Sequence, residues 1–441
     1  TLASYRQLKT LYTFLDDWGV QLAPLGTLLP PDQAQIRPED RNTLRWCVRA
    51  GGDQGFLFLN NYQDRVDTEA HEDVMRPNLG VVAPSAALDD EERRHLEALD
   101  DQMDMAEHRG VQFRLLTDSG EVRLPATGGL SLRRGISAIL PFNLRVGALR
   151  LRWATVQPFA RLETDTGEHL FFFAPDGMAP EYGLDATTVA AVAGAESSRT
   201  VGDDLLVVTP ALGFCAPLVV TVTDGRQVRI TTLTREQADD CWKVELWGRA
   251  RLVHTRAGLL GDADTLEVYR IGDNDLSFGV YPAPEGELAG PQGALRGEPD
   301  GLLTRYRLRV PAVEPALRVT LLRKDKALLS FGPGLLQGMS DLFLRIGYIG
   351  DSLEAFVDGR LVSDNLCNGT PWEIGLKRFT PEIVDKGMYL YVAPLVKGSA
   401  ADKAVGKQLA RAYGRALDDE ENAEILSIEA LPEYRVRVAR G

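Results

Sequence analysis

The chain has 441 residues, which is enough for two to four domains with a large buried core. Its apolar content of 44% and charged content of 25% are those of an ordinary globular protein. A net charge of −14 argues against nucleic-acid partners, because a phosphate backbone requires a basic surface.

The first predicted element is a helix within residues 1 to 24. Its apolar side chains recur at helical spacing, and a glycine stands where a C-terminal cap belongs; these residues are Tyr5, Leu8, Leu11, Tyr12, Leu15, Trp18 and Gly19. Such a face requires burial, either by a partner outside this chain or by the domain that follows.

A proline-rich connector over residues 25 to 41 is followed by segments with the period-2 pattern of strands. A strand pair is predicted at 44–49 and 55–59, with two glycines and an aspartate between the strands. The next feature, near 85–110, is strongly charged and lacks a clean apolar face. We expect a solvated insertion there, with a short helix from about Asp89.

Two further hairpins are predicted, one within 160–173 and one that joins 205–209 to 218–223. A threonine followed three residues later by a glutamine then has the form of a capping box, which predicts a closing helix near 234–248. The first β-rich domain is therefore expected to span residues 25–248.

Residues 249–441 repeat the β pattern and are expected to form a second, jelly-roll-like sandwich. Its best-specified hairpin turns at Asp358 and Gly359, because a D-G pair supplies the positive φ values of a tight turn. An insertion rich in Ala, Lys, Glu and Asp is predicted near 399–424. Many short strands with few helices indicate a mainly β protein of antiparallel β-sandwich or jelly-roll domains.

A polar loop is predicted after this hairpin, and it holds the densest group of candidate functional residues: Asp364, Asn365, Asn368, Trp372 and Glu373. In the structural interpretation, Glu373 pairs with a following Lys or Arg, while the shorter side chains satisfy turn backbone. Two functional interpretations remain open: the indole stacks on a sugar ring while amides bind hydroxyls, or the loop docks a barrel domain.

A second candidate group ends the strand at 55–59 and comprises Asn60, Asn61 and Tyr62. These side chains could bind a ligand or line an interface with another domain. The structural interpretation is favoured, and it predicts backbone partners for both asparagines.

Metal and cofactor chemistry have little support in the sequence. The five histidines form no HExxH pattern or i, i+4 pair, and no nucleotide-binding or serine-hydrolase motif occurs. The four cysteines are scattered without CxxC spacing, which favours a reducing compartment over a disulfide framework. No stretch approaches the roughly 20 apolar residues that span a membrane.

Four stretches, in this order, resemble the bacterial β-galactosidases of glycoside hydrolase family 35. The longest, DLFLRIGYIGDSLEAFVDGRLVSDNLCNGTPWEIGLKRF at 341–379, is similar to the family's C-terminal β-domain. The other three lie earlier in the chain: GFLFLNNYQ at 55–63, LPFNL with LRWAT at 140–155, and FFFAPDG with PE at 171–181. Four matches in order make the resemblance fairly specific.

The resemblance implies a retaining exo-glycosidase that removes terminal β-linked galactose without a metal or other cofactor. Both catalytic glutamates of the family lie on a (β/α)₈ barrel of roughly 250 residues, and no position here matches their motifs. We therefore expect no catalytic residue in this chain, and residues 1–24 would be the closing helix and exit of a missing barrel.

The chain is thus expected to be the non-catalytic part of such an enzyme, inactive alone, which supports the barrel and shapes its mouth. Its expected partners are the catalytic barrel domain or chain and a β-galactoside glycan, with homo-oligomerisation left open. The alternative is a free-standing carbohydrate-binding or interaction protein built from the same β-domains. That alternative gives the opening helix no purpose.

Overall fold

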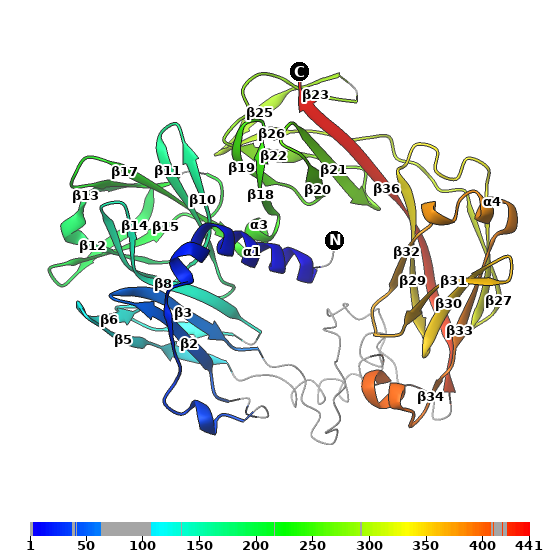
Figure 1. The fold of residues 1–441 in the computed structure, drawn as a ribbon, viewed down its shortest axis with the longest axis horizontal. Coiled ribbons are helices and arrows are strands. Elements are labelled where there is room, and N and C mark those ends of the chain that lie inside the picture. Colours follow the sequence, from blue (N-terminus) through cyan, green and yellow to red (C-terminus); the bar gives the residue numbers. More distant parts are fainter. Residues whose placement is uncertain are drawn as a thin grey trace.

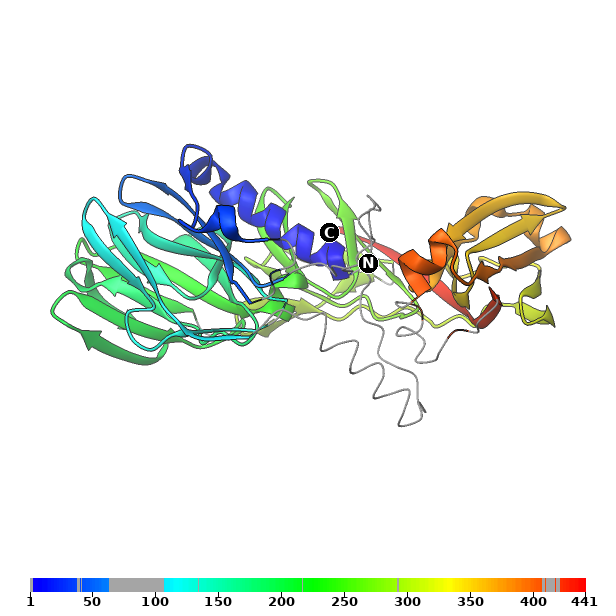
Figure 2. The ribbon, with the colours of Figure 1, turned by 90° about the horizontal axis from the view of Figure 1, so that it is seen from below.

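The computed structural model describes residues 3–37, 40, 42–62, 107–133, 135–215, 217–291, 293–406, 409, 417 and 421–441. The described chain is mainly β, with several antiparallel sheets and one long N-terminal helix, which confirms the predicted fold class (Figure 1). Three β-sandwiches follow one another along the sequence. Figures 1 and 2 both place the first and third at opposite ends of the molecule.

In the first sandwich, an eight-stranded sheet packs against a five-stranded sheet. The larger sheet has the order β1 (Gly26–Leu28), β2 (Arg45–Gly51), β3 (Gln54–Asn60), β8 (Ser137–Val146), β9 (Leu149–Ala154), β12 (Tyr182–Asp185), β15 (Leu205–Pro210) and β14 (Ala195–Val201). The smaller sheet has the order β10 (Gln157–Thr164), β11 (Gly167–Ala174), β17 (Gln227–Thr234), β16 (Leu218–Val222) and β13 (Val189–Ala193). One pair in it, β11 with β17, is parallel.

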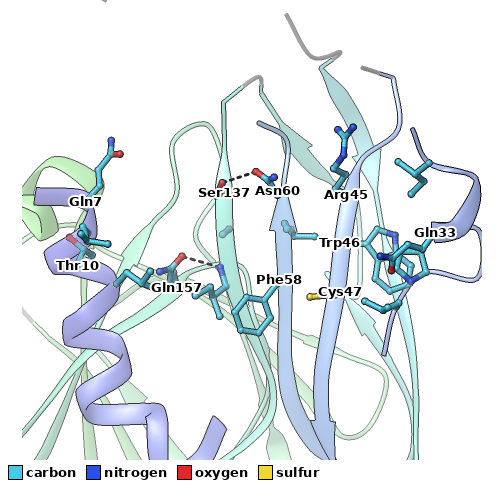
Figure 3. A pocket seen from close by; sticks show the side chains of 18 of the residues that line it. Gln7, Thr10, Gln33, Arg45, Trp46, Cys47, Phe58, Asn60, Ser137 and Gln157 are labelled. Atoms are coloured by element: carbon cyan, nitrogen blue, oxygen red, sulfur yellow. Dashed lines mark hydrogen bonds between the residues drawn. The ribbon is translucent and has the colours of Figure 1, made fainter. Parts of the chain in front are cut away.

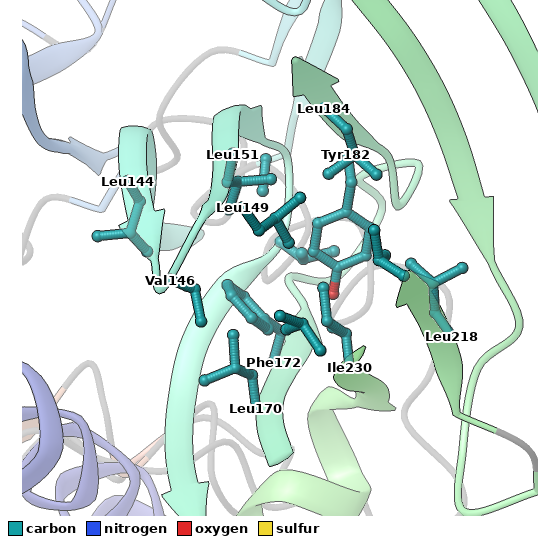
Figure 4. Packing of buried hydrophobic residues seen from close by; sticks show 14 of the residues in the cluster. Leu144, Val146, Leu149, Leu151, Leu170, Phe172, Tyr182, Leu184, Leu218 and Ile230 are labelled. Atoms are coloured by element: carbon teal, nitrogen blue, oxygen red, sulfur yellow. The ribbon is translucent and has the colours of Figure 1, made fainter. Parts of the chain in front are cut away.

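The core of this sandwich lies between the two sheets, where Leu144 and Leu151 face Leu170, Phe172 and other apolar side chains (Figure 4). A second apolar layer covers the other face of the larger sheet. It is completed by two antiparallel strand pairs, β4 (His108–Val111) with β7 (Leu130–Leu132) and β5 (Phe113–Thr117) with β6 (Gly120–Leu124). The larger sheet is therefore packed on both faces over much of its area.

The second sandwich has its own core and two sheets. One sheet comprises β18 (Cys241–Leu246), β19 (Arg249–His254), β22 (Phe278–Tyr281), β26 (Leu303–Tyr306) and β25 (Gly297–Asp300). The other comprises β20 (Gly258–Gly261), β21 (Thr265–Ile271), β36 (Glu424–Arg440), β23 (Leu288–Gly290) and β24 (Gly293–Leu295).

The third sandwich shares the 17-residue strand β36 with the second, because residues 433–439 pair with β21 and residues 424–433 pair with β29. Its shared sheet adds β29 (Asp341–Ile349) and β32 (Trp372–Gly375). The facing sheet comprises β27 (Leu317–Arg323), β28 (Lys326–Phe331), β33 (Met388–Ala393), β30 (Ser352–Val357) and β31 (Arg360–Leu366). The expected single sandwich over 249–441 therefore contains two separate cores.

Helices are few among the described residues. The long one is α1 (Ala3–Leu22), and two short ones are α3 (Arg235–Asp239) and α4 (Glu382–Lys386). Single 3₁₀ turns span Gln33–Gln35, Ala186–Thr188 and Lys377–Phe379, and a π-helical turn spans Asp402–Gly406. The first expected helix is confirmed, but its predicted cap at Gly19 is wrong, because the helix continues to Leu22.

Two further sequence predictions are wrong. The capping box forms at Thr234, but α3 ends at Asp239 rather than near 248, because Cys241 begins a strand that pairs with β19. The segments 205–209 and 218–223 are strands but not a hairpin. Their connection crosses between the two sheets of the first sandwich, so β15 pairs with β12 and β14 while β16 pairs with β13 and β17.

The predicted D-G hairpin is confirmed, since Asp358 and Gly359 have φ values of 47° and 76° between β30 and β31. The prediction of a long polar loop after this hairpin is largely wrong. Strand β31 extends to Leu366 and β32 begins at Trp372, so only a short connection lies between them. Most of the insertion predicted at 85–110, including Asp89, lies outside the described residues. Within 399–424, the structure describes the π-helical turn and the strand β35 (Glu421–Asn422), which pairs with β34 (Leu395–Val396).

A buried histidine joins the first and second sandwiches. His169 on β11 is fully buried, and its two ring nitrogens lie 2.8 Å from the Tyr281 hydroxyl and 2.9 Å from the Thr231 hydroxyl. Burial lowers the pKa of His169 to about 3 and that of His254, on β19, to about 4. Both rings are therefore neutral in the folded protein at neutral pH.

Because of these two histidines, we expect the protein to lose stability in mild acid. Below about pH 6.5 the unfolded chain binds protons that the buried rings do not, so the free energy of unfolding falls as pH falls, until pH approaches the lowered pKa values. Each ring should contribute a loss of about 1.4 kcal/mol between about pH 7.5 and 5.5. Urea unfolding measures this effect. Between these two pH values, the free energy of unfolding of His169→Gln should fall by about 1.4 kcal/mol less than that of the wild type. An unchanged pH dependence would contradict the neutral, buried ring.

Candidate functional site

Trp372 lies in the core of the third sandwich. Its side chain is 8% exposed and is one of the apolar cluster between the sheets, so its ring faces protein rather than solvent. Neighbouring Glu373 points outward, and both Nε and Nη2 of Arg345 donate to its Oε1, at 2.9 and 2.7 Å. The predicted pairing with Lys377 or Arg378 is therefore wrong, because the cross-strand neighbour on β29 lies opposite Glu373.

Two further residues of this group, Asn365 and Asn368, serve local structure. Oδ1 of Asn368 accepts hydrogen bonds from the backbone N–H and the hydroxyl of Thr370, at 3.1 and 2.7 Å, which closes a turn. The backbone carbonyl of Asn365 accepts a hydrogen bond from the Tyr348 hydroxyl at 2.7 Å. Asp364 is exposed on β31 opposite Glu354, so these side chains line no common cavity with the buried indole.

Both asparagines of the second candidate group donate to backbone carbonyls, as the structural interpretation predicts. Nδ2 of Asn61 lies 2.9 Å from the Arg133 carbonyl, and Nδ2 of Asn60 lies 3.1 Å from the Tyr62 carbonyl. Asn61 is fully buried, whereas Tyr62 is 40% exposed. Asn60 ends β3 of the first sandwich and the other two residues follow it, whereas the first candidate group belongs to the third sandwich (Figure 1). The two candidate groups therefore lie in different sandwiches.

Helix α1 is fixed to the chain by one of its faces. Phe14 and Trp18 are fully buried in the core of the first sandwich, where Phe14 contacts Phe56 edge-on and Trp18 contacts Phe172. Along the same face, Asp17 accepts a hydrogen bond from the backbone N–H of Arg161 at 2.7 Å.

Polar contacts extend this attachment to α3 and β18. Arg6 forms an ion pair with Asp240, and Asp17 forms one with Lys243. Lys9 lies 4.2 Å from the ring centre of Trp242, and burial lowers its pKa to about 8. The helix thus contacts both the first and the second sandwich, and we expect it to be a rigid part of the protein.

The face of α1 beside the buried one is apolar and exposed. Its side chains are between 37% and 59% exposed and comprise Tyr5, Leu8, Leu11, Tyr12 and Leu15. We call these five residues the outer face of α1. They are the face that the sequence pattern identified, but only Trp18 of that pattern is buried in this chain. Exposed apolar surfaces of this kind mark interaction sites in globular proteins.

A large groove lies beside this outer face (Figure 3). It has a volume of about 1170 Å³ and runs between α1, the segment around the 3₁₀ turn at Gln33, and strands β2, β3 and β8. Its apolar lining includes Leu8 and Leu11 from the helix and Trp46 and Phe58 from the sheet. Asn60 lies at its rim, where its Oδ1 accepts a hydrogen bond from the Ser137 hydroxyl at 3.0 Å.

The charged residues that line this groove are all basic, namely Arg37, Arg45 and Arg235. Arg45 donates to the backbone carbonyls of Arg37 and Asp40, at 3.2 and 2.9 Å, and Arg235 pairs with Asp239 at 3.2 Å. The groove is thus mainly apolar, with three arginines at its walls, one of which is neutralised by Asp239. Sequence reasoning missed it, because its walls come from segments more than 200 residues apart.

Gly19, in the last turns of α1, is a further feature of this helix that its own packing does not explain. A glycine inside a helix costs about 0.5–1 kcal/mol relative to alanine, and a Cβ added here would meet nothing within 4 Å. No contact among the described residues therefore requires a glycine at this position. Close approach of a partner backbone would.

Gly19→Ala is expected to stabilise the isolated chain by about 0.5–1 kcal/mol, since alanine is the better helix former and the site is open. Gly55→Ala is the matched opposite case, because its Cβ would lie 2.3 Å from the Arg49 carbonyl oxygen. Chemical unfolding of both variants measures the change in the free energy of unfolding, which should rise for Gly19→Ala and fall for Gly55→Ala. A loss of stability in Gly19→Ala would contradict the finding that a Cβ at this position meets no other atom.

A second, polar pocket of about 550 Å³ lies where the N-terminal end of α1 meets α3, β21 and the third sandwich. Both acidic and basic side chains line it, among them Asp240, Arg256, Arg270, Arg345 and Glu373. They are paired with one another or with neighbours, as in Arg256 with Glu236 at 2.8 Å and Arg270 with Asp273 at 2.9 Å. These ion pairs account for most of the charged side chains that line the pocket in the described part of the chain.

Within the described ranges, no three His, Cys, Asp or Glu side chains come together as a metal site would require. All four cysteines are free, and Cys241 and Cys367 are buried. None of the described helices has the length and apolarity to cross a membrane. Comparison with protein-family models finds no match for this chain, and comparison with curated proteins finds none either.

Proposed function

We propose that this chain is the non-catalytic, β-rich part of a β-galactosidase-like retaining exo-glycosidase that removes terminal β-linked galactose. In this proposal the outer face of α1 and the adjoining groove receive the catalytic (β/α)₈ barrel. The β-sandwiches then support that barrel and shape its mouth. The glutamates that perform the hydrolysis belong to the barrel.

The observation that carries this proposal is the exposure of five apolar side chains on a helix that is otherwise firmly attached. Two of them, Leu8 and Leu11, continue directly into an apolar groove large enough to take part of another domain. A face of this kind is stable in water only at a cost, which burial against a partner removes. The resemblance of four ordered stretches to glycoside hydrolase family 35 supports a barrel as that partner.

The burial of Trp372 weighs against direct sugar recognition by the loop after the D-G hairpin. Stacking on a pyranose requires an exposed ring face, whereas this indole packs between two sheets. Glycan contact is therefore assigned to the barrel.

An activity measurement tests the proposal. The purified 441-residue chain should not hydrolyse an aryl β-galactoside, because no position in its sequence matches the catalytic glutamate motifs of the family. Addition of a separately produced catalytic barrel of this enzyme class should give a complex that hydrolyses the substrate and survives gel filtration. Turnover by the chain alone, abolished by replacing one of its own carboxylates, would overturn the proposal.

A further inference from the structure

The third sandwich carries an unusual edge strand, β27. It pairs with β28 and is the outermost strand of its five-stranded sheet in the described structure. Three of its apolar side chains are exposed: Val319 at 39%, Leu321 at 61% and Leu322 at 55%. An edge strand also presents backbone N–H and C=O groups that have no strand partner on one side.

Two of these side chains belong to the core face of the sheet. Val319 lies opposite Leu329 and Leu321 lies opposite Ala327, and both partners on β28 are fully buried. Cross-strand neighbours point to the same face, so the apolar core continues onto β27. The exposed fraction nevertheless rises along the strand, from half-buried Leu317 through Val319 at 39% to Leu321 at 61%.

Another edge of the protein shows the usual protection. Strand β14 ends the eight-stranded sheet and exposes polar side chains, including Glu196, Ser198 and Arg199. Such residues prevent the addition of further strands. Strand β27 differs in that it exposes three apolar side chains, Val319, Leu321 and Leu322, between its polar ones, and an added strand would bury them.

The charges around β27 indicate the chemistry of its partner. Arg318 and Arg323 are exposed on the strand, and exposed Lys324 follows it. Of the acids close to it in the sequence, Asp325 is buried and lies 3.4 Å from Arg323, and Glu314 is exposed before the strand begins. A second copy of this chain would bring these cations together, whereas a segment that carries carboxylates would neutralise them.

We propose that β27 binds an extended, carboxylate-bearing segment of another polypeptide, which adds a strand to the five-stranded sheet and covers Val319 and Leu321. Backbone hydrogen bonds and the apolar side chains would supply affinity, while the three cations select an acidic sequence. This surface lies on the third sandwich and requires neither a barrel nor a sugar. Its test is therefore independent of the proposed hydrolase function.

The test uses the 441-residue chain and fluorescein-labelled ten-residue peptides. One peptide alternates valine with glutamate, and the other alternates valine with lysine. At low ionic strength, fluorescence anisotropy should show that the glutamate peptide binds at least about tenfold more tightly than the lysine peptide. Raising the salt concentration should reduce the difference, since these charges are exposed and screened.

Two variants separate the apolar and the charged contributions. Leu321→Asn should weaken binding of the glutamate peptide at least about tenfold, and Arg323→Gln should reduce the preference for it over the lysine peptide. Leu361→Asn is the matched control, because Leu361 is 54% exposed on β31 at the other edge of the same sheet. It should leave binding unchanged.

Three outcomes would overturn the proposal. Equal affinity for both peptides would remove the selection by charge, and an equal loss in Leu361→Asn would place the peptide elsewhere. Dimerisation of the chain in sedimentation velocity, abolished by Leu321→Asn, would assign the edge to a second copy. A matched thermal midpoint of the variants ensures that a loss of binding is not a loss of folding.

Discussion

Trp372→Ala should reduce the free energy of unfolding by about 3–5 kcal/mol, with a fall in thermal midpoint of at least about 6 °C. The indole is 8% exposed and packs in the core between the two sheets of the third sandwich. Its removal leaves a cavity that the surrounding strands cannot fill. Thermal unfolding followed by near-UV circular dichroism measures the effect.

The neighbouring variant Glu373→Gln is the control for this prediction. Glu373 pairs with Arg345 on an exposed surface, so its loss should change stability by less than about 1 kcal/mol. If Trp372→Ala left the thermal midpoint unchanged while it weakened galactoside binding by the complete enzyme, the indole would contact sugar. The structural assignment of Trp372 would then be wrong.

Substitutions on the two faces of α1 should differ strongly in their effect on stability. Phe14→Ala is expected to cost about 3–5 kcal/mol, because the ring is fully buried against Phe56. Leu8→Ala should stay within about 0.5 kcal/mol, because Leu8 is 46% exposed. Urea unfolding of the isolated chain compares the two variants directly.

A cost of several kcal/mol for Leu8→Ala would show that the outer face packs within this chain in solution. Equal, small effects of both substitutions would show instead that the helix is not docked on the first sandwich. Either result would contradict the arrangement of α1.

The β architecture follows from local sequence signals. Alternation and turn residues predict β2 with β3, β10 with β11, and β30 with β31, because register in a hairpin is set within a few residues. The false hairpin between 205–209 and 218–223 has the same local signals. Its strands enter different sheets, and that choice depends on tertiary packing that the local sequence does not contain.

The candidate site was harder to predict. A polar loop of acids, amides and an indole resembles a binding loop in composition, yet the structure buries Trp372 and pairs Glu373 with a residue 28 positions away. Helical periodicity identified the outer face of α1, but periodicity cannot show which stripe of a helix faces its own chain. Phe14 was missing from the predicted stripe and is fully buried.

The most direct test of the central claim is the dissociation constant between this chain and a catalytic barrel of glycoside hydrolase family 35, measured by isothermal titration calorimetry. Tyr12→Asp and Leu8→Asp place a charge on the outer face of α1 and should each weaken binding at least about tenfold. Leu361→Asp, on the exposed surface of the third sandwich, should leave it unchanged. Binding that is absent in the wild type, or equally strong in all variants, would contradict the claim.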